Sequence, residues 1–209
     1  MAGFGTYKFA VIQDIWDVST SSRLVMLATF LSTLVLPIQQ AVLVGIILSI
    51  LDFVYTSTQD MQISELVENE DGMFAERPSP TKLTDNSVTI LYSWSPLFFA
   101  SARAMDDLLP AVGQAKQAVV ILRLHGRSRI GSTYIQIVER YEARLQANGG
   151  KLMLSGVSQN VWDQLERTET FEAIPEADVF MVDEILGNST RKAAAAAKEW
   201  LAQLPTAKE

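Results

Sequence analysis

The uncharged stretch LVMLATFLSTLVLPIQQAVLVGIILSIL, Leu24–Leu51, decides the fold expected for the first part of this 209-residue chain. A bilayer core of about 30 Å requires roughly 20 helical residues, and this run is longer. Leu, Ile and Val side chains occupy every helical face of residues 41–51, so no polar stripe remains for water. We therefore expect the stretch to lie in lipid. The alternative is a buried helical hairpin of a water-soluble protein.

Pro37 lies near the middle of the run, and two glutamines follow it closely. Proline lacks the backbone donor and clashes with the preceding turn, so a kink or a break is expected there. The run is then either one tilted, kinked span or a hairpin of two half-length helices joined at residues 36–37. Each half would hold about 12–14 residues, too few to cross a bilayer alone. We predict a Pro-broken transmembrane helical hairpin over residues 23–56, with residues 1–22 as a membrane-flanking segment.

The net charge of −7 and the absence of cysteine exclude several classes of protein. A nucleic-acid partner would require a basic surface to neutralise phosphates, so none is expected. Disulfides and cysteine-based metal sites are excluded as well. The only histidine, His125, ends an apolar strand and is expected to be a hydrogen-bonded structural residue, because one histidine without nearby ligands is a poor metal site. We predict no metal and no cofactor.

Residues 57–86 are polar and acidic, with turn signals at residues 71–72 and 78–80. We expect a solvated acidic linker that contains one short strand at residues 62–67. A cation site in this acidic cluster is the less favoured alternative.

Residues 87–204 alternate between apolar runs typical of strands and amphipathic stretches typical of helices. The run AVVILRL, residues 118–124, is apolar on both faces, as in a strand covered by helices on two sides. This alternation predicts an α/β domain with a central mixed, largely parallel sheet and helices packed against it. The expected strands are 88–94, 118–124, 151–155 and 178–180, and the expected helices are 98–109, 132–147, 158–166 and 182–204.

Several stretches, in this order along the chain, resemble one known family. They are TFLSTLVLPIQQAVLVGIILSIL at residues 29–51, SWSPLFFASARAMDDLLP at residues 93–110, VVILRLHGRSRIGSTYIQIVERYEARLQANGGKLMLSGV at residues 119–157 and VWDQLERTETFEAI at residues 161–174. The first resembles the last transmembrane hairpin of the SulP anion transporters, such as sulfate permeases, and the others resemble their cytoplasmic STAS domain. The resemblance covers roughly residues 10–190.

The resemblance implies a carboxy-terminal portion of a sulfate-permease-type secondary anion transporter. Its STAS domain would serve a cytoplasmic regulatory and dimerisation role at a bacterial-type inner membrane. The anion site of such transporters lies between half-helices that have no counterpart here, so this chain is not expected to transport anions alone. The implied partners are membrane lipid, the remaining membrane domain, and a second copy through the STAS domain. Two alternatives are a membrane-tethered STAS signalling module and a soluble phosphate or nucleotide binder.

The loop R-S-R-I-G-S-T-Y-I, residues 127–135, corresponds to the Asp-Ser-Ser/Thr-Gly loop of STAS regulatory proteins, where the second hydroxyl accepts phosphate. The resemblance places Gly131 at the Asp position, Ser132 and Thr133 at the hydroxyls, and Tyr134 at the Gly. Thr133 and Ser132 are therefore possible phosphosites, although we favour Ser132 as the cap of the following helix.

Two arginines in the same loop, Arg127 and Arg129, are possible contacts to a phosphate or nucleotide, with a solvated pair as the simpler interpretation. Asp106 and Asp107 are expected to be solvated rather than catalytic. No nucleophile–base pair can be assembled, so no enzymatic activity is predicted.

Overall fold

The computed structural model describes residues 20–59, 62–69, 71, 73–93 and 105–204, of which residues 20–22 and 57–59 are described for their backbone alone. The chain divides into two compact units, Met1–Gln59 and Asp60–Glu209. Each unit is described by itself.

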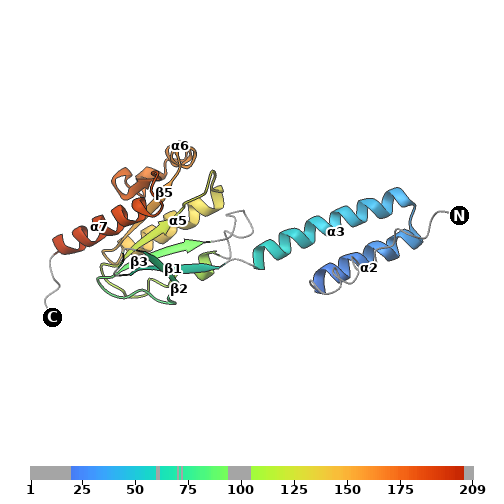
Figure 1. The fold of residues 1–209 in the computed structure, drawn as a ribbon, viewed down its shortest axis with the longest axis horizontal. Helices are drawn as coiled ribbons and strands as arrows, with labels where there is room; N and C mark the ends of the chain where they lie inside the picture. The colour runs from blue at the N-terminus through green and yellow to red at the C-terminus, as the bar shows by residue number, and fades with distance from the viewer. Residues whose placement is uncertain (1–19, 60–61, 70, 72, 94–104, 205–209) are drawn as a thin grey trace. The chain divides into compact units, whose positions relative to one another are not determined.

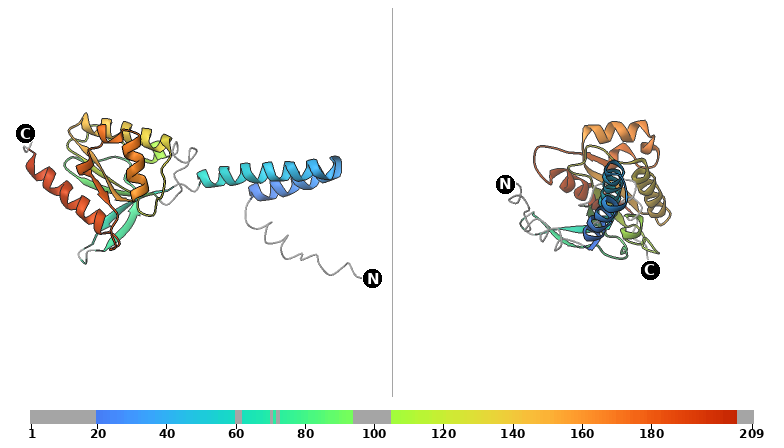
Figure 2. Two further views of the ribbon diagram at one scale, coloured as in Figure 1. Left: turned by 90° about the horizontal axis from the view of Figure 1, so that it is seen from above. Right: turned by 90° about the vertical axis from the view of Figure 1, so that its right-hand side faces the viewer.

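The first unit is a hairpin of helices α2 (Thr20–Val35) and α3 (Ile38–Gln59), which lie side by side and antiparallel (Figures 1 and 2). The break falls at residues 36–37, so the predicted Pro-broken hairpin is confirmed and the single kinked span is wrong. The half-length expectation is wrong for α3, because its 22 residues correspond to about 33 Å of helix, enough to cross a bilayer core. The sequence estimate ended this helix at Leu51, but the helix continues past Asp52.

Small residues let the two helices approach each other. Ala41 of α3 is fully buried, whereas most large apolar side chains of the hairpin are exposed. A side-chain carbon added at Gly45 would lie 2.9 Å from Cγ2 of Thr29 on α2, closer than van der Waals contact allows. The Thr29 hydroxyl donates to the Val25 carbonyl at 2.8 Å, so the polar group of this interface is satisfied within its own helix.

Among the described residues, one helix is long and apolar enough to cross a membrane, over Ile38–Thr56. Only 6% of its most apolar stretch is buried within the structure. The shorter apolar stretch Arg23–Val35 precedes it. Outward apolar side chains on nearly all faces are typical of a helix whose surroundings are apolar, whether lipid or other protein segments.

The second unit is built on a six-stranded sheet with the order β2-β1-β3-β4-β5-β6. Its strands are β1 (Ile63–Glu68), β2 (Phe74–Pro78), β3 (Val88–Ser93), β4 (Val119–Arg123), β5 (Lys151–Val157) and β6 (Val179–Met181). Strands β3 to β6 pair in parallel, and β1 pairs antiparallel with both β2 and β3. The predicted mixed, largely parallel sheet is confirmed.

Helices cover both faces of this sheet (Figures 1 and 2). One face carries α5 (Ser132–Gln146) and α6 (Gln159–Arg167), with two short 3-10 helices, η1 (Thr170–Glu172) and η2 (Glu176–Asp178), before β6. The other face carries α7 (Asn188–Gln203), whose alanines pack on alternate residues of the strands. Side chains of β4 therefore alternate between two cores, with Val120 and Leu122 toward α5, and Val119 and Ile121 toward α7.

Two parts of this unit differ from the sequence expectation. Residues 74–78, expected as linker, form the edge strand β2, so both arms of a hairpin from the acidic segment join the sheet. Residues 182–187, expected as the first turns of the last helix, form a loop, and α7 begins only at Asn188 after Gly187 in the left-handed conformation. Of the expected helix at 98–109, the structure describes only residues 105–109, with a helix at 105–108; the remainder lies outside the described residues.

The loop before α5 is fixed by one side chain from α6. The amide of Gln164 accepts a hydrogen bond from the Ile130 N–H at 3.2 Å and donates one to the Ile130 carbonyl. A single glutamine thus satisfies both backbone groups of a buried loop residue.

Adding one methyl group at Gly45 tests the close helix contact. We expect Gly45→Ala to destabilise the hairpin by about 1 kcal/mol, because overpacking displaces a helix that has no room to move. Combining it with Thr29→Ser, which removes Cγ2 and keeps the hydroxyl, restores stability. Thermal unfolding of the detergent-solubilised chain, followed by loss of helical signal, measures both. A Gly45→Ala variant as stable as the parent chain would contradict the contact.

Removing the Gln164 amide tests the loop anchor. Gln164→Ala leaves the N–H and carbonyl of Ile130 without partners, so we expect a loss of about 1–3 kcal/mol of stability. The control is Gln159→Ala on the same helix, whose amide bonds only the exposed Asp163 carboxylate; it should change stability by less than about 0.5 kcal/mol. Equal effects of the two substitutions in denaturant unfolding would contradict the proposed anchor.

Candidate functional site

The candidate site is the loop that joins β4 to α5, at the carboxyl end of the parallel strands. Ligands of open α/β sheets commonly bind at this edge, outside the ends of the strands. The loop and the first turn of α5 together contain all four predicted site residues: Arg127, Arg129, Ser132 and Thr133.

The two hydroxyl residues lie in the first turn of α5. Gly131 is the N-cap, and no side chain makes a capping hydrogen bond, so the predicted cap role of Ser132 is wrong. Ser132 is the first residue of the helix and is exposed, while Thr133 is half-buried. Neither hydroxyl makes a hydrogen bond with the described residues. The next residue, Tyr134, is fully buried, and burial raises the pKa of its phenol above its usual range.

The two arginines of the loop have different environments. The Arg127 guanidinium donates to the Ser93 carbonyl at the end of β3, over 2.5 Å, and is half-buried. The Arg127 carbonyl in turn accepts a hydrogen bond from the Ser158 hydroxyl at 2.8 Å. Arg127 therefore connects the end of β3 to the residue that follows β5. The expectation of two solvated arginines is wrong for Arg127. Arg129 is exposed and makes no ion pair with the described residues.

The hydroxyl of Ser93 is buried and has no hydrogen-bond partner among the described residues. It borders a small cavity at the ends of β3 and β4, which Arg127 and Tyr134 also line. This cavity lies beside the start of α5, whose backbone N–H groups carry partial positive charge.

His125 is half-buried and lies two residues after the end of β4. Its ring makes no hydrogen bond with the described residues, so the predicted hydrogen bond of this structural histidine is wrong. Its backbone packs closely on Gly156, where an added side-chain carbon would lie 3.0 Å from the His125 N. Burial, followed by the charge of Arg123, lowers the pKa of His125. This shift favours the neutral imidazole, and the backbone of His125 packs between β4 and β5.

The two neighbouring aspartates, expected to be solvated, differ from each other. Asp106 forms ion pairs with Arg140 at 3.3 Å and Arg144 at 2.9 Å, and so links residues 105–108 to α5. Asp107 is exposed. All three charges of the cluster are partly exposed, so it contributes modestly to stability.

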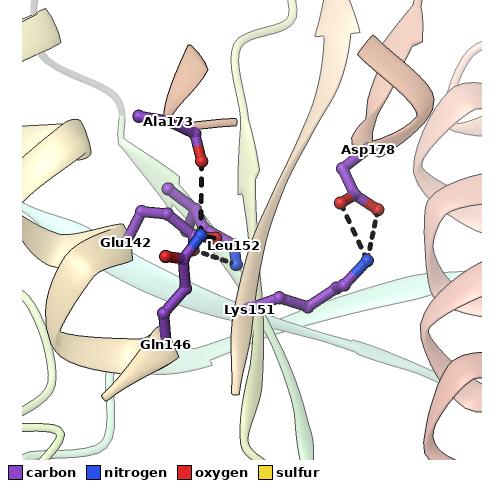
Figure 3. A network of polar contacts seen from close by, with 6 residues as sticks. All are labelled: Glu142, Gln146, Lys151, Leu152, Ala173 and Asp178. Carbon is purple, nitrogen blue, oxygen red and sulfur yellow. Dashed lines mark hydrogen bonds and ion pairs between the residues drawn. The ribbon is translucent and has the colours of Figure 1, made fainter. Parts of the chain in front are cut away.

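Sequence analysis missed a buried polar network between α5, β5 and η2 (Figure 3). Glu142 is only 2% exposed, and its two carboxylate oxygens accept hydrogen bonds from the Gln146 amide at 2.8 Å and the Leu152 N–H at 2.5 Å. Beside it, the Lys151 ammonium contacts both oxygens of Asp178 at 2.8 Å. The available signal was the place of Glu142 between Tyr141 and Leu145 on the apolar face of the helix.

Burial raises the pKa of Glu142 to about 7, and the negative charge of Asp178 raises it further. The two hydrogen bonds and the positive charge of Lys151 lower this pKa, but by less than burial raises it. The carboxyl group therefore changes its charge near neutral pH. Among the residues that the structure describes, no group of three or more His, Cys, Asp or Glu side chains could hold a metal ion.

Residues 79–182 match the family model of the STAS domain. A comparison with curated protein sequences gives no significant match.

Three solved structures resemble the chain. The murine Solute Carrier 26 family member A9 anion transporter, in its inward-facing state, matches 91% of this chain and 31% of its own, with 20% identity and a TM-score of 0.70. A second structure, the overall structure of SLC26A9, matches 94% of this chain and 34% of its own, with 14% identity and a TM-score of 0.65. A sulfate transporter family protein from Wolinella succinogenes matches 59% of this chain and 93% of its own, with 27% identity and a TM-score of 0.47.

The chain thus spans about a third of the length of the two solute carrier chains, and shares their fold over nearly all of its own residues. The predicted resemblance is confirmed, and residues 79–182 of the chain form a STAS domain.

Proposed function

We propose that this chain is the carboxy-terminal portion of a sulfate-permease-type anion transporter. The observation that carries the proposal is the order of parts within one chain: an apolar hairpin of α2 and α3, followed directly by a STAS domain. The fold shared with two structures of an anion transporter over more than nine-tenths of the chain supports the same assignment.

The hairpin by itself offers no translocation path. Transporters bind their substrates between discontinuous helices contributed by two repeats, and a single hairpin supplies neither repeat. Three hydroxyl side chains of α2 also hydrogen-bond within the helix: those of Thr29, Ser32 and Thr33; Ser32, for example, donates to the Ala28 carbonyl at 2.8 Å. We infer that the remaining membrane domain supplies the anion site and that this chain alone does not transport.

The STAS domain then has a regulatory and dimerisation role on the cytoplasmic side of a bacterial-type inner membrane. The whole chain carries a net charge of −7. The membrane lipid, the rest of the transporter and a second copy of the STAS domain are the proposed partners.

A second candidate function, a membrane-tethered STAS signalling module, is favoured by one observation at the start of α5. The Ser132 hydroxyl is exposed and unused, Thr133 is half-buried, and Arg129 lies exposed in the same loop. A phosphate on either hydroxyl would lie at the positive end of a helix dipole. The same loop could contact the phosphate of a nucleotide through Arg129, with Arg127 held at Ser93.

Membrane insertion of the hairpin is tested by charge substitutions on its exposed apolar face. The parent chain should remain in membranes during alkaline extraction. Replacing Val42, Ile46 and Ile50 with lysine should release it, since each lysine at the centre of a span costs about 2.5–3.5 kcal/mol. Three lysines at the exposed glutamines 136, 159 and 203 serve as the control with equal charge and should not alter retention. A parent chain that is soluble without detergent would refute the membrane assignment.

Transport is tested in proteoliposomes loaded with the purified chain. We expect no sulfate uptake above that of empty vesicles, and uptake when the chain is joined to a complete membrane domain. Sulfate uptake by the chain alone would contradict the proposal that the anion site lies elsewhere.

Phosphorylation of the loop separates the two candidate functions. Labelling of the full chain by phosphate in cell extract, reduced at least about tenfold in Thr133→Ala or Ser132→Ala, would support the signalling module. Thr168→Ala is the control, because its hydroxyl bonds the Gln164 carbonyl at 2.9 Å at the end of α6, far along the sequence from the loop. Equal labelling of all four proteins would remove the support for these phosphosites.

A further inference from the structure

The first half of strand β5 has no strand neighbour on one side. Strand β6 has three residues and pairs with β5 only from Leu154 onward. The Lys151 N–H points the other way, to the Ala118 carbonyl before β4, so the Leu152 N–H points to the uncovered side. A buried backbone N–H requires an acceptor, and Glu142 of α5 supplies it.

The Glu142 carboxylate lies against a segment that closes the sheet. Gln146, which donates to Glu142, also donates to the Ala173 carbonyl at 3.4 Å, between η1 and η2 (Figure 3). Asp178, at the end of η2, is 9% exposed at its side chain and pairs with Lys151. Segment 170–178 is therefore attached to α5 and β5 through the neighbours of Glu142.

One ammonium serves two carboxyl groups in this network. Among the described residues, the ionisable groups that act on Glu142 are Lys151 of β5 and Asp178 of η2. Lys151 contacts Asp178 directly and also lies over the Trp200 ring of α7, 5.0 Å from its centroid. When Glu142 is ionised, a second buried negative charge faces Asp178 with no cation of its own in contact.

We propose that Glu142 is a proton switch of the STAS unit: neutral, it holds segment 170–178 firmly on α5 and β5, and ionised, it loosens this attachment. The switch goes beyond the proposed transporter assignment and does not depend on it. It gives the domain a stability that changes with the pH around it.

The direction follows from proton linkage. The carboxyl group binds its proton more tightly in the folded unit, with a pKa of about 7, than in the unfolded chain, where the ordinary value of 4.5 applies. The stabilisation is therefore fully present below pH 4.5 and is lost as pH rises through 7. Above that pH the loss is complete, because the group is then ionised in both states.

Hydrogen exchange of the full chain in detergent micelles tests the switch. For peptides covering β5 and segment 170–178, after correction for intrinsic exchange, we expect the opening equilibrium constant to rise roughly 70-fold from pH 5 to pH 8. Glu142→Gln, which resembles the neutral carboxyl group, should show a rise of less than about fivefold and should match or exceed the parent protection at pH 8. Glu139→Gln, one turn earlier on α5, should retain the parent pH dependence.

A second measurement needs no substitution. The Leu152 amide proton, hydrogen-bonded to Glu142, should show a chemical-shift titration with a midpoint near 7 in leucine-labelled parent chain. An amide shift that stays constant from pH 5.5 to 8.5, or equal pH dependence of exchange in the parent chain and Glu142→Gln, would overturn the proposal. Neither outcome affects the membrane and transport tests, so the two proposals fail separately.

Discussion

The second unit depends on one constraint: strand β4 lies between two helical layers, and neither of its faces reaches water. Val119, Val120 and Ile121 are fully buried, so every backbone group of the strand must pair with β3 or β5. The parallel ladders on both sides satisfy this requirement. They also bring the ends of three strands to one edge, and the loop that carries the candidate site starts at that edge.

Much of this organisation could be predicted because β4 has an unusual sequence. A run without polar alternation is typical of a strand covered on both sides, and the run at residues 118–124 therefore predicted a parallel sheet with helices on both faces. The edge strand β2 was missed because its residues, FAERP, are mostly exposed and carry no apolar alternation. It forms because β1 needs a partner on its outer side, which is a requirement of the fold and not a local preference.

Errors in the hairpin have a similar origin. The estimate of half-length helices ended the second helix at the first charged residue, Asp52, although one aspartate near the end of a long helix does not interrupt its hydrogen bonding. At the loop, the sequence correctly indicated where the hydroxyls and arginines would lie. It could not indicate that Arg127 would be held by the Ser93 carbonyl, because that contact joins residues 34 positions apart. Glu142 was missed for the same reason, since its role depends on the short length of β6.

The exposed edge of β2 has a consequence for the protein at high local density. An open strand edge can recruit a strand from another molecule and start aggregation. Here the edge carries the charged side chains of Glu76 and Arg77 and ends at Pro78, which has no N–H to offer. A neighbouring sheet that paired with β2 would have to remove water from the charged groups of Glu76 and Arg77. It would still form an incomplete set of backbone hydrogen bonds, because Pro78 has no N–H. Crowded copies of the domain can therefore meet without joining their sheets into fibres.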